Sequence, residues 1–400
     1  MNLKNRTSLW TYAWDLESDG VENVLKKLKD LGVNAISLAS SYHSGFFIHS
    51  HNTKHKMYFA EDGVVYFHPD MKYFEDTNIK PKIAKISKMN DWFDIVSEKI
   101  SKYDLDLWAW TVCNHNTRLG LLHPEAVITN VFGDKYYHML CPSNQEVRSY
   151  VIGLAKNLSE KYSISAIQFE ALGFWDPSGV LLGLNHGHHH ERYGTVLRDV
   201  ETMLMSLCFC ISCARRSEAF GLDLNKLKEQ ILEHLNKFFI SAPIVNTSLP
   251  SSLRELYSEI PLLIEFETVR RNIVSSLCEE IKNKLSSSSK SKLFLLEKFD
   301  PEVARFVDAF FISVYGKNAT EAYEIVFNEK KLINSQSNLY AGVNLGFNSI
   351  FGPGELADIT NSVISAGADG VNYYNYSESP RRALNWLKPA IDSLKNNFGV

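Results

Sequence analysis

The sequence predicts an α/β protein folded as a (β/α)8 barrel, on three observations. The 400 residues contain eight short apolar runs typical of buried strands, helical periodicity separates these runs, and the eighth run ends close to residue 400. Parallel neighbours in a sheet need helical crossovers, and eight strands close a sheet into a barrel. A doubly wound open sheet is the competing architecture, but no run is followed by a G-x-G-x-x-G or P-loop pattern.

The predicted elements follow in order along the chain. Strands are expected at 9–14, 34–39, 105–112, 165–170, 292–296, 307–315, 339–343 and 370–374. Helices are expected over 17–31, where Gly32 ends the helix, and over 90–102 and 143–162. Long βα loops follow strands two and three, and a helical insertion at about 192–285 follows strand four and ends in a serine run. The chain is therefore expected to form one TIM-barrel domain over 1–400.

Composition and charge exclude several classes of protein. The content of 45% hydrophobic and 22% charged residues is that of a globular protein. The net charge is −4 and the basic residues form no stripe, so no nucleic-acid partner is expected. No apolar signal core or 18-residue apolar stretch occurs, so we expect a soluble, cytoplasmic protein without a membrane partner. Six cysteines are too few for a disulfide scaffold.

The loops after strands two, three and four are rich in histidine and aromatic residues. Twelve of the 13 histidines lie there, all except His234. In a (β/α)8 barrel these loops form the reactive end. Sugars present apolar faces that stack on aromatic rings and hydroxyls that need polar partners, so this mixture predicts a carbohydrate site. The alternative is that the aromatics are core residues and the histidines are solvated. The candidate binding residues are Tyr42, His43, Trp110, His115, Asn116, Arg118, Trp175, His188, Tyr315 and Tyr374.

Glu170 is the strongest catalytic candidate, because it ends the apolar fourth strand and is expected to face the pocket. Partial desolvation there would raise its pKa, as a general acid for a glycosidic oxygen requires. A structural salt bridge at the rim is the alternative. Glycoside hydrolysis needs a second carboxylate, for which Glu297 and Asp300 after strand five are the candidates and Asp15 is a weaker one. The end of strand eight, 373–376, is expected to line the substrate.

Three cysteines, Cys208, Cys210 and Cys213, form a C-x-C-x2-C pattern whose thiolates could share one Zn²⁺ with a fourth ligand. A Cys-Pro pair at 141–142 precedes the third helix, and Glu170 ends strand four. This order resembles the family 42 β-galactosidases and related uncharacterised glycoside-hydrolase-like barrels, over about 105–215. The resemblance implies a structural zinc, no organic cofactor, Glu170 as acid/base and, by analogy, a homo-oligomer. The implied zinc ligands are Cys141, Cys208, Cys210 and Cys213, with Cys113 as the alternative fourth.

Two departures from that family leave the reaction open. The family writes Asn-Glu at the end of strand four, where this chain has Phe169-Glu170, and its nucleophilic Glu at the end of strand seven is absent here. Either the second carboxylate has moved to Glu297 or Asp300, or the substrate assists, or hydrolysis is lost. Two other functions therefore stay open: a metal-dependent TIM-barrel hydrolase or isomerase that uses the histidines of 186–190 with His43 or His115, and a non-catalytic sugar-binding barrel.

Overall fold

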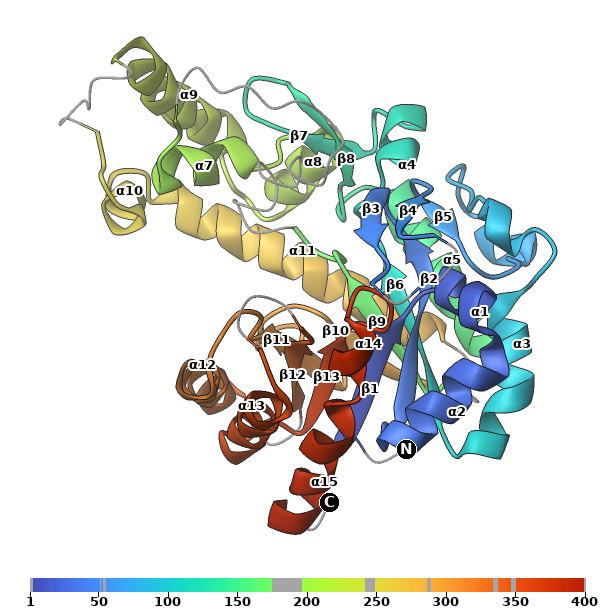
Figure 1. Cartoon of the computed structure of the whole chain (residues 1–400). Helices are drawn as coiled ribbons and strands as arrows, with labels where there is room; N and C mark the ends of the chain where they lie inside the picture. Colours follow the sequence, from blue (N-terminus) through green and yellow to red (C-terminus); the bar gives the residue numbers. More distant parts are fainter. Residues whose placement is uncertain are drawn as a thin grey trace.

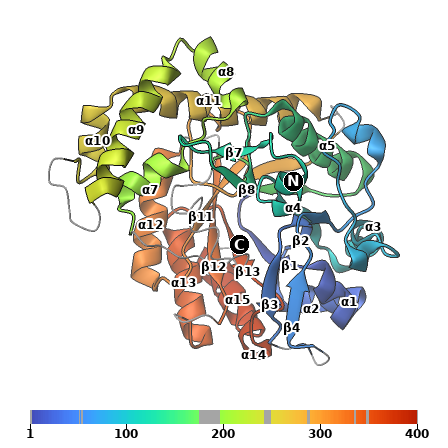
Figure 2. The same ribbon diagram turned by 90° about the horizontal axis from the view of Figure 1, so that it is seen from above.

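The computed structural model describes residues 3–50, 52, 55–174, 196–241, 249–285, 289–333, 337–346 and 350–398. Its centre is a closed barrel of eight parallel strands (Figures 1 and 2), in which β1 pairs with both β2 and β13. This confirms the predicted (β/α)8 fold. The barrel strands are β1 (Arg6–Thr11), β2 (Ala35–Tyr42), β6 (Asp106–Val112), β9 (Ala166–Glu170), β10 (Lys292–Leu295), β11 (Ala309–Ser313), β12 (Asn338–Asn344) and β13 (Gly370–Tyr374).

The structure corrects the predicted first strand and the helix expected between the fifth and sixth strands. The first strand ends at Thr11, and α1 (Ala13–Asp19) begins directly after it, because the Asp15 carboxylate accepts a hydrogen bond from the backbone N–H of Tyr12 (2.9 Å) and starts the helix. The segment 296–308 between β10 and β11 holds turns and no α-helix, so helices do not separate every pair of strands. One of these turns is closed by bonds from Val303 and Ala304 to the carbonyl of Asp300.

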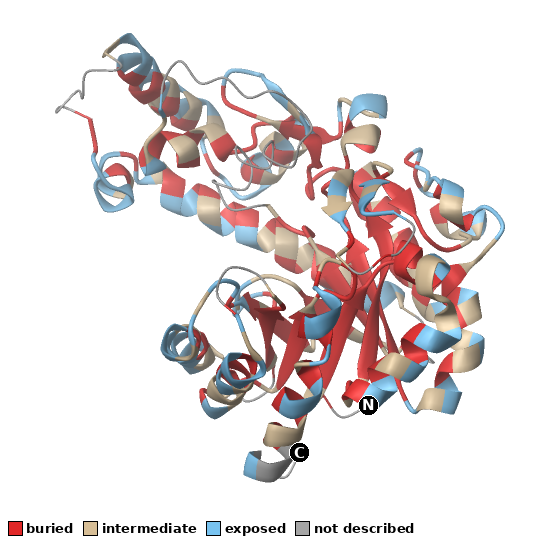
Figure 3. Cartoon of the chain, in the orientation of Figure 1, coloured by how far each residue is buried: buried red, intermediate tan, exposed pale blue. Residues whose placement is uncertain are grey.

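Helices cover the outside of the barrel (Figure 2), and the strands beneath them are almost entirely buried (Figure 3). Gly32 ends α2 in the left-handed conformation (φ 86°), which glycine adopts without strain. Asp91 and Asn144 cap α3 and α5 by accepting backbone hydrogen bonds. The helices on this layer are α2 (Val21–Leu31), α3 (Trp92–Lys99), α5 (Gln145–Lys161), α12 (Ala319–Leu332), α13 (Pro353–Ser365) and α15 (Leu387–Phe398), with a short α14 (Arg381–Leu384).

The segments predicted as long loops contain short strands and helices. After β2, a hairpin of β3 (Gly45–Ile48) and β4 (Met57–Ala60) is followed by β5 (Val64–Val65), which pairs antiparallel with β2. After β6 come α4 (Thr117–Leu122) and a hairpin of β7 (Val127–Thr129) and β8 (Lys135–Leu140). Three 3-10 turns lie between β5 and β6: η1 (Met71–Phe74), η2 (Lys85–Ser87) and η3 (Ile100–Tyr103).

Between β9 and β10 the described chain is helical (Figure 1), and its side chains form a small apolar core of their own. Its helices are α7 (Asp199–Ser206), α8 (Ile211–Ala219), α9 (Leu224–Ser241), α10 (Leu253–Glu259) and α11 (Leu262–Lys284). The helix α11 joins this group to the barrel, where Glu280 pairs with the fully buried Arg148 of α5 (2.8 Å). Among the described residues, no helix is both long and apolar enough to cross a membrane.

Candidate active site at the barrel mouth

Glu170 ends β9 at the carboxyl-terminal mouth of the barrel, as predicted. Side chains alternate along a strand, so Glu170 shares the inner face with Gln168, which accepts a hydrogen bond from Trp10 Nε1 inside the barrel (3.2 Å). The half-buried Glu170 accepts a bond from Trp110 Nε1 on its Oε2 (2.6 Å). Burial raises the pKa of this carboxyl, and the Trp110 hydrogen bond only partly opposes that effect.

Aromatic residues from the ends of four other strands form one group with Trp110. Its ring centroid lies 5.0 Å from that of Tyr42, 5.3 Å from that of Tyr12 and 6.3 Å from that of Tyr374. Tyr315 follows β11 and lies 5.7 Å from Tyr374. The structure therefore brings together four of the predicted binding residues, Tyr42, Trp110, Tyr315 and Tyr374, and adds Tyr12, which the sequence pattern placed inside the first strand.

A second carboxylate, Glu378, lies four residues beyond the end of β13 and was missed by the sequence analysis. Its Oε1 accepts hydrogen bonds from the Tyr374 hydroxyl (3.0 Å), from the Tyr12 hydroxyl (3.5 Å) and from the Asn375 side-chain amide. In return, Asn375 Oδ1 accepts the backbone N–H of Glu378 (2.9 Å). Burial raises the pKa of Glu378, and the three donors oppose the rise. The signal was available, because loops after barrel strands carry reactive groups.

Glu170 and Glu378 face the same group of tyrosines. The Tyr12 hydroxyl lies 3.1 Å from that of Tyr42 and 3.0 Å from that of Tyr374, so three hydroxyls form one connected group. Burial raises the pKa of Tyr42, and the charges of Glu170 and Glu378 both raise it further. Desolvation of its hydroxyl raises the pKa of Tyr315, whose side chain is 37% exposed, and Tyr374 and the same two carboxylates raise it further. Each carboxylate is therefore close enough to act electrostatically on the same two phenols.

Glu297 points to a different layer of the barrel. Phe294 packs inside the barrel against Trp108, with ring centroids 5.1 Å apart, whereas Glu297 lies in the bend two residues beyond the end of β10 and turns toward Gly173. There its Oε1 accepts the backbone N–H of Gly173 (3.1 Å), and burial raises its pKa to about 7. Its charge raises the pKa of the buried Cys278 thiol on α11. The carboxylate thus lies between the end of β9 and α11, outside the tyrosine group.

The other two predicted acids have local structural roles. Asp300 Oδ1 accepts the backbone N–H of Glu302 (2.8 Å) and caps the turn that leads to β11. Asp15 is buried beneath Tyr12, whose backbone N–H it binds, and burial raises the pKa of Asp15 to about 8. The nearby charges of Asp19 and Glu378 add to that rise.

Of the predicted histidines, His43 and His115 lie beside the aromatic group. The His43 ring stacks on Tyr42 at 4.3 Å and on His115 at 4.2 Å. Asn116 instead caps α4 by accepting the N–H of Leu119 (2.9 Å), and Arg118 donates two bonds to the carbonyl of Gly63 (3.0 and 2.8 Å). Trp175 and His188, and the other histidines of 186–190, lie outside the described residues.

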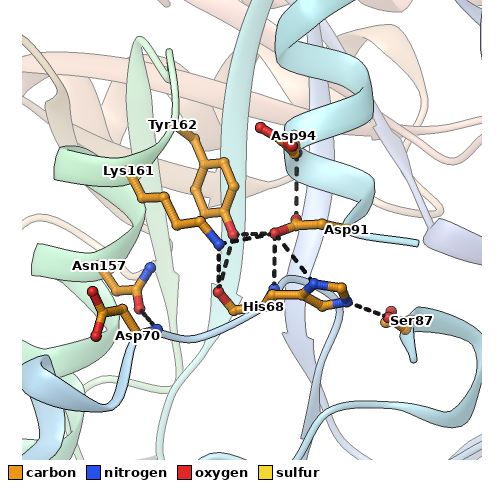
Figure 4. Close-up of polar contacts among 8 residues, drawn as sticks. All are labelled: His68, Asp70, Ser87, Asp91, Asp94, Asn157, Lys161 and Tyr162. Carbon is orange, nitrogen blue, oxygen red and sulfur yellow. Dashed lines mark hydrogen bonds and ion pairs between the residues drawn. The ribbon is translucent and has the colours of Figure 1, made fainter. Parts of the chain in front are cut away.

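His68 shows what a loop histidine does when its role is structural (Figure 4). Its Nε2 lies 2.6 Å from the carbonyl of Ser87, and its backbone N–H binds Asp91 Oδ2 (3.1 Å). The same carboxylate oxygen accepts bonds from the Tyr162 hydroxyl (2.6 Å) and Lys161 Nζ (3.1 Å) (Figure 4). These contacts fasten the loop after β2 to the end of α5.

Four buried thiols converge where β8 meets the start of α8. The Sγ of Cys141 lies 3.5 Å from that of Cys213, 3.7 Å from that of Cys208 and 3.6 Å from that of Cys210. All four atoms lie within 4.8 Å of one another. Four thiolates on one tetrahedral zinc ion, with Zn–S bonds of about 2.3 Å, would stand about 3.8 Å apart, so the residues fit that ion. Cys113 lies elsewhere, where its pKa is raised by burial and by Glu170 and Glu297.

No protein-family model and no curated protein sequence matches this chain. Solved structures do. An α-L-fucosidase isoenzyme 2 from Paenibacillus thiaminolyticus is 12% identical, with a TM-score of 0.56 over 99% of this chain and 49% of its own. The β-galactosidase from the psychrophilic Marinomonas ef1 is 11% identical, with a TM-score of 0.57 over 99% of this chain and 60% of its own.

The β-galactosidase from the Antarctic haloarchaeon Halorubrum lacusprofundi is also 11% identical, with a TM-score of 0.52 over 98% of this chain and 58% of its own. This chain thus spans about half to three-fifths of the length of these proteins. At this identity the likeness establishes the fold alone, which is a (β/α)8 barrel.

Proposed function

We propose that the protein is a glycosidase that hydrolyses a glycosidic bond with Glu170 as the proton donor. The observation that carries the proposal is the position of Glu170, half-buried at the barrel mouth and bonded to Trp110, whose ring lies beside Tyr42, Tyr12 and Tyr374. The barrel fold shared with a fucosidase and two β-galactosidases supports the same reaction class.

The surroundings of Glu170 suit a proton donor. Burial favours the protonated carboxyl, so Glu170 keeps its proton at a higher pH than an exposed glutamate does. In the aromatic group the exposed Tyr315 and the half-buried Tyr374 offer apolar faces for a sugar, whereas Tyr42 and Trp110 are buried and support them from below.

The four thiols would hold a structural zinc ion. The ion supplies cross-linking and no open coordination position, because four protein thiolates close the site. Its ligands Cys141, Cys208, Cys210 and Cys213 would tie the end of β8 to α8. We expect one zinc per chain by elemental analysis, and we expect a strong chelator to lower the melting temperature and the activity together. A Cys208→Ser variant that binds a full equivalent of zinc would contradict this assignment.

A catalytic metal held by loop histidines is less well supported. Among the described residues, the four cysteines are the group whose ligand atoms converge closely enough for a metal ion. His43 and His115 stack face to face with an interplanar angle of 22°, and imidazole lone pairs lie in the ring plane, so these two rings do not aim at a shared ion.

The test is hydrolysis of a broad panel of chromogenic aryl glycosides, with zinc content measured on the same preparation. We expect at least one glycoside to be cleaved, and we expect Glu170→Gln to lower kcat/KM on a substrate with a poor leaving group by about 10²- to 10⁴-fold. With substrates that have good leaving groups, Glu170→Gln should lose less of its kcat/KM, because the departing oxygen needs less protonation. If the wild-type chain cleaves no glycoside but binds sugars as tightly as Glu170→Gln does, the chain is a sugar-binding barrel.

A further inference from the structure

We infer that Glu378 is the second catalytic carboxylate, which works with Glu170 as nucleophile or general base. The inference rests on the proposed function. Glu378 takes the role that the sequence pattern assigned to Glu297 or Asp300. The inference depends on which carboxylate contacts the tyrosine group.

The first argument is the way Glu378 is held. Donors from two neighbouring strand ends, Tyr12 after β1 and Tyr374 and Asn375 at β13, all bind the same oxygen, Oε1. This anchors the carboxylate while Oε2 accepts none of these bonds. A carboxylate held through one oxygen presents the other to a reacting atom or a water molecule, which is the preorganisation that catalysis needs.

The second argument is the contrast between the two carboxylates. Among the described residues, Glu170 accepts one hydrogen bond, from an indole N–H, whereas Glu378 accepts three, from two hydroxyls and an amide. Donors stabilise the ionised form of a carboxyl, so Glu378 is the more readily ionised member and Glu170 the more readily protonated one. A glycosidase needs one carboxyl in each form.

The proposed reaction follows from that assignment. Glu170 gives its proton to the glycosidic oxygen as that oxygen leaves the anomeric carbon with the bonding electron pair. Glu378 either takes a proton from the attacking water or bonds the anomeric carbon, and in the second case a water deprotonated by Glu170 then releases the sugar. Both routes consume one water and return both carboxyls to their starting forms after proton exchange. The anomeric configuration of the product distinguishes the two routes.

The third argument is that Glu297 differs from Glu378 in its surroundings. Glu297 binds the backbone N–H of Gly173 and acts electrostatically on Cys278 of α11, whereas Glu378 acts on Tyr12, Tyr42, Tyr315 and Tyr374. Both are half-buried glutamates in loops after barrel strands. Glu297→Gln is therefore the matched variant for Glu378→Gln.

The experiment uses an aryl glycoside that the wild-type chain cleaves. We expect Glu378→Gln to lower kcat/KM by about 10³-fold or more and Glu297→Gln to lower it less than tenfold. Sodium azide or sodium formate should raise the activity of Glu378→Ala at least tenfold, because a small anion replaces the missing carboxylate, and should not raise that of Glu297→Ala. Loss and anion rescue at Glu297 with retained activity in Glu378→Gln would overturn the inference.

Two further readouts separate chemistry from folding. Melting temperatures of the variants show whether each is folded. Tyr374→Phe keeps Glu378 but removes one of its donors, so the acidic limb of the kcat/KM profile should move to higher pH; an unmoved limb contradicts the assignment. If the wild-type chain cleaves no glycoside, the proposed function itself fails and this inference falls with it. If it cleaves one but Glu378→Gln is fully active, only this inference fails.

Discussion

Buried glutamates in the barrel mouth and in the helical insertion have opposite electrostatic surroundings. In the insertion, Glu201 is completely buried, and its Oε1 lies 2.5 Å from Arg198 Nη2 and 2.9 Å from His234 Nε2. Burial alone would raise the pKa of Glu201, but the bonds from Arg198 and His234 outweigh it and lower the pKa to about 2. In the mouth, the donors to Glu170 and Glu378 that the described part of the chain supplies are neutral, and burial raises the pKa of both carboxyls.

The difference separates a structural carboxylate from a reactive one. A buried carboxylate paired with cations is held ionised and contributes to the cohesion of its helices, but it cannot deliver a proton near neutral pH. A half-buried carboxyl with neutral partners costs stability in its ionised form and gains a pKa suited to proton transfer. The four predictions below test this contrast, from the largest expected effect to the smallest.

Glu201→Gln should destabilise the fold strongly. The change removes a buried negative charge and leaves Arg198 facing an amide, and breaking such a pair costs about 3 kcal/mol. Glu170→Gln in the mouth should leave the free energy of unfolding unchanged or raise it. Urea denaturation of the two variants at pH 7 measures both values. Equal destabilisation by the two changes would show that the mouth carboxylates are as structural as Glu201.

The acid limb of stability should depend on Glu201. Its folded pKa of about 2 lies below the ordinary value of 4.5, so its contribution is fully present above pH 4.5 and is lost as the pH falls from 4.5 towards 2. In Glu201→Gln, the slope of unfolding free energy against pH should be shallower across this window. A slope identical to that of the wild-type chain would contradict the assigned pairing.

Asp15 should contribute the opposite slope. Its folded pKa of about 8 lies above the ordinary value of 3.8, so ionising it in the fold costs free energy that increases as the pH rises from about 4 to about 8. Asp15→Asn removes this cost and should raise the melting temperature of the variant, relative to wild type, more at pH 8 than at pH 5. Its amide oxygen can still accept the N–H of Tyr12. If the difference in melting temperature between Asp15→Asn and the wild-type chain does not change with pH, the pKa of Asp15 is not raised in the fold.

Trp110→Phe should have the smallest effect and a specific one. The phenyl ring keeps the apolar surface beside Tyr42 but cannot donate a hydrogen bond to Glu170. Losing that donor raises the pKa of Glu170 further, so the alkaline limb of the kcat/KM profile should move to higher pH. We expect a loss in kcat/KM of less than about tenfold at the optimum. A shift to lower pH would mean that Trp110 does not stabilise the ionised form of Glu170.

The pattern of residues was enough to predict the barrel and one carboxylate. Strand β9 could be predicted because it is an apolar run that ends in a single acid, and the last residue of a barrel strand lies at the mouth. The structure places Glu170 there. The cysteine spacing likewise predicted a cluster that the structure forms. In both cases the prediction depends on residues within one short segment, the fourth strand for Glu170 and positions 208–213 for the cysteines.

The second carboxylate could not be chosen in this way. Glu297 lies two residues beyond β10 and Glu378 four residues beyond β13, so distance from a strand end favours Glu297 as the second carboxylate. The structure places Glu297 outside the tyrosine group. The direction of each side chain depends on how its loop turns and on which partners it finds. Tyr12 shows the same limit, since it starts α1 instead of continuing β1.

By itself, the sequence determined the order of the strands, the position of Glu170 at the end of one of them, and the grouping of three thiols in six residues. Only the tertiary structure decided that Tyr12, Tyr374 and Asn375, at the neighbouring ends of β1 and β13, converge on Glu378. The physical reason is that hydrophobic periodicity specifies which residues are buried, whereas contacts between chain segments more than 350 residues apart arise from closure of the barrel.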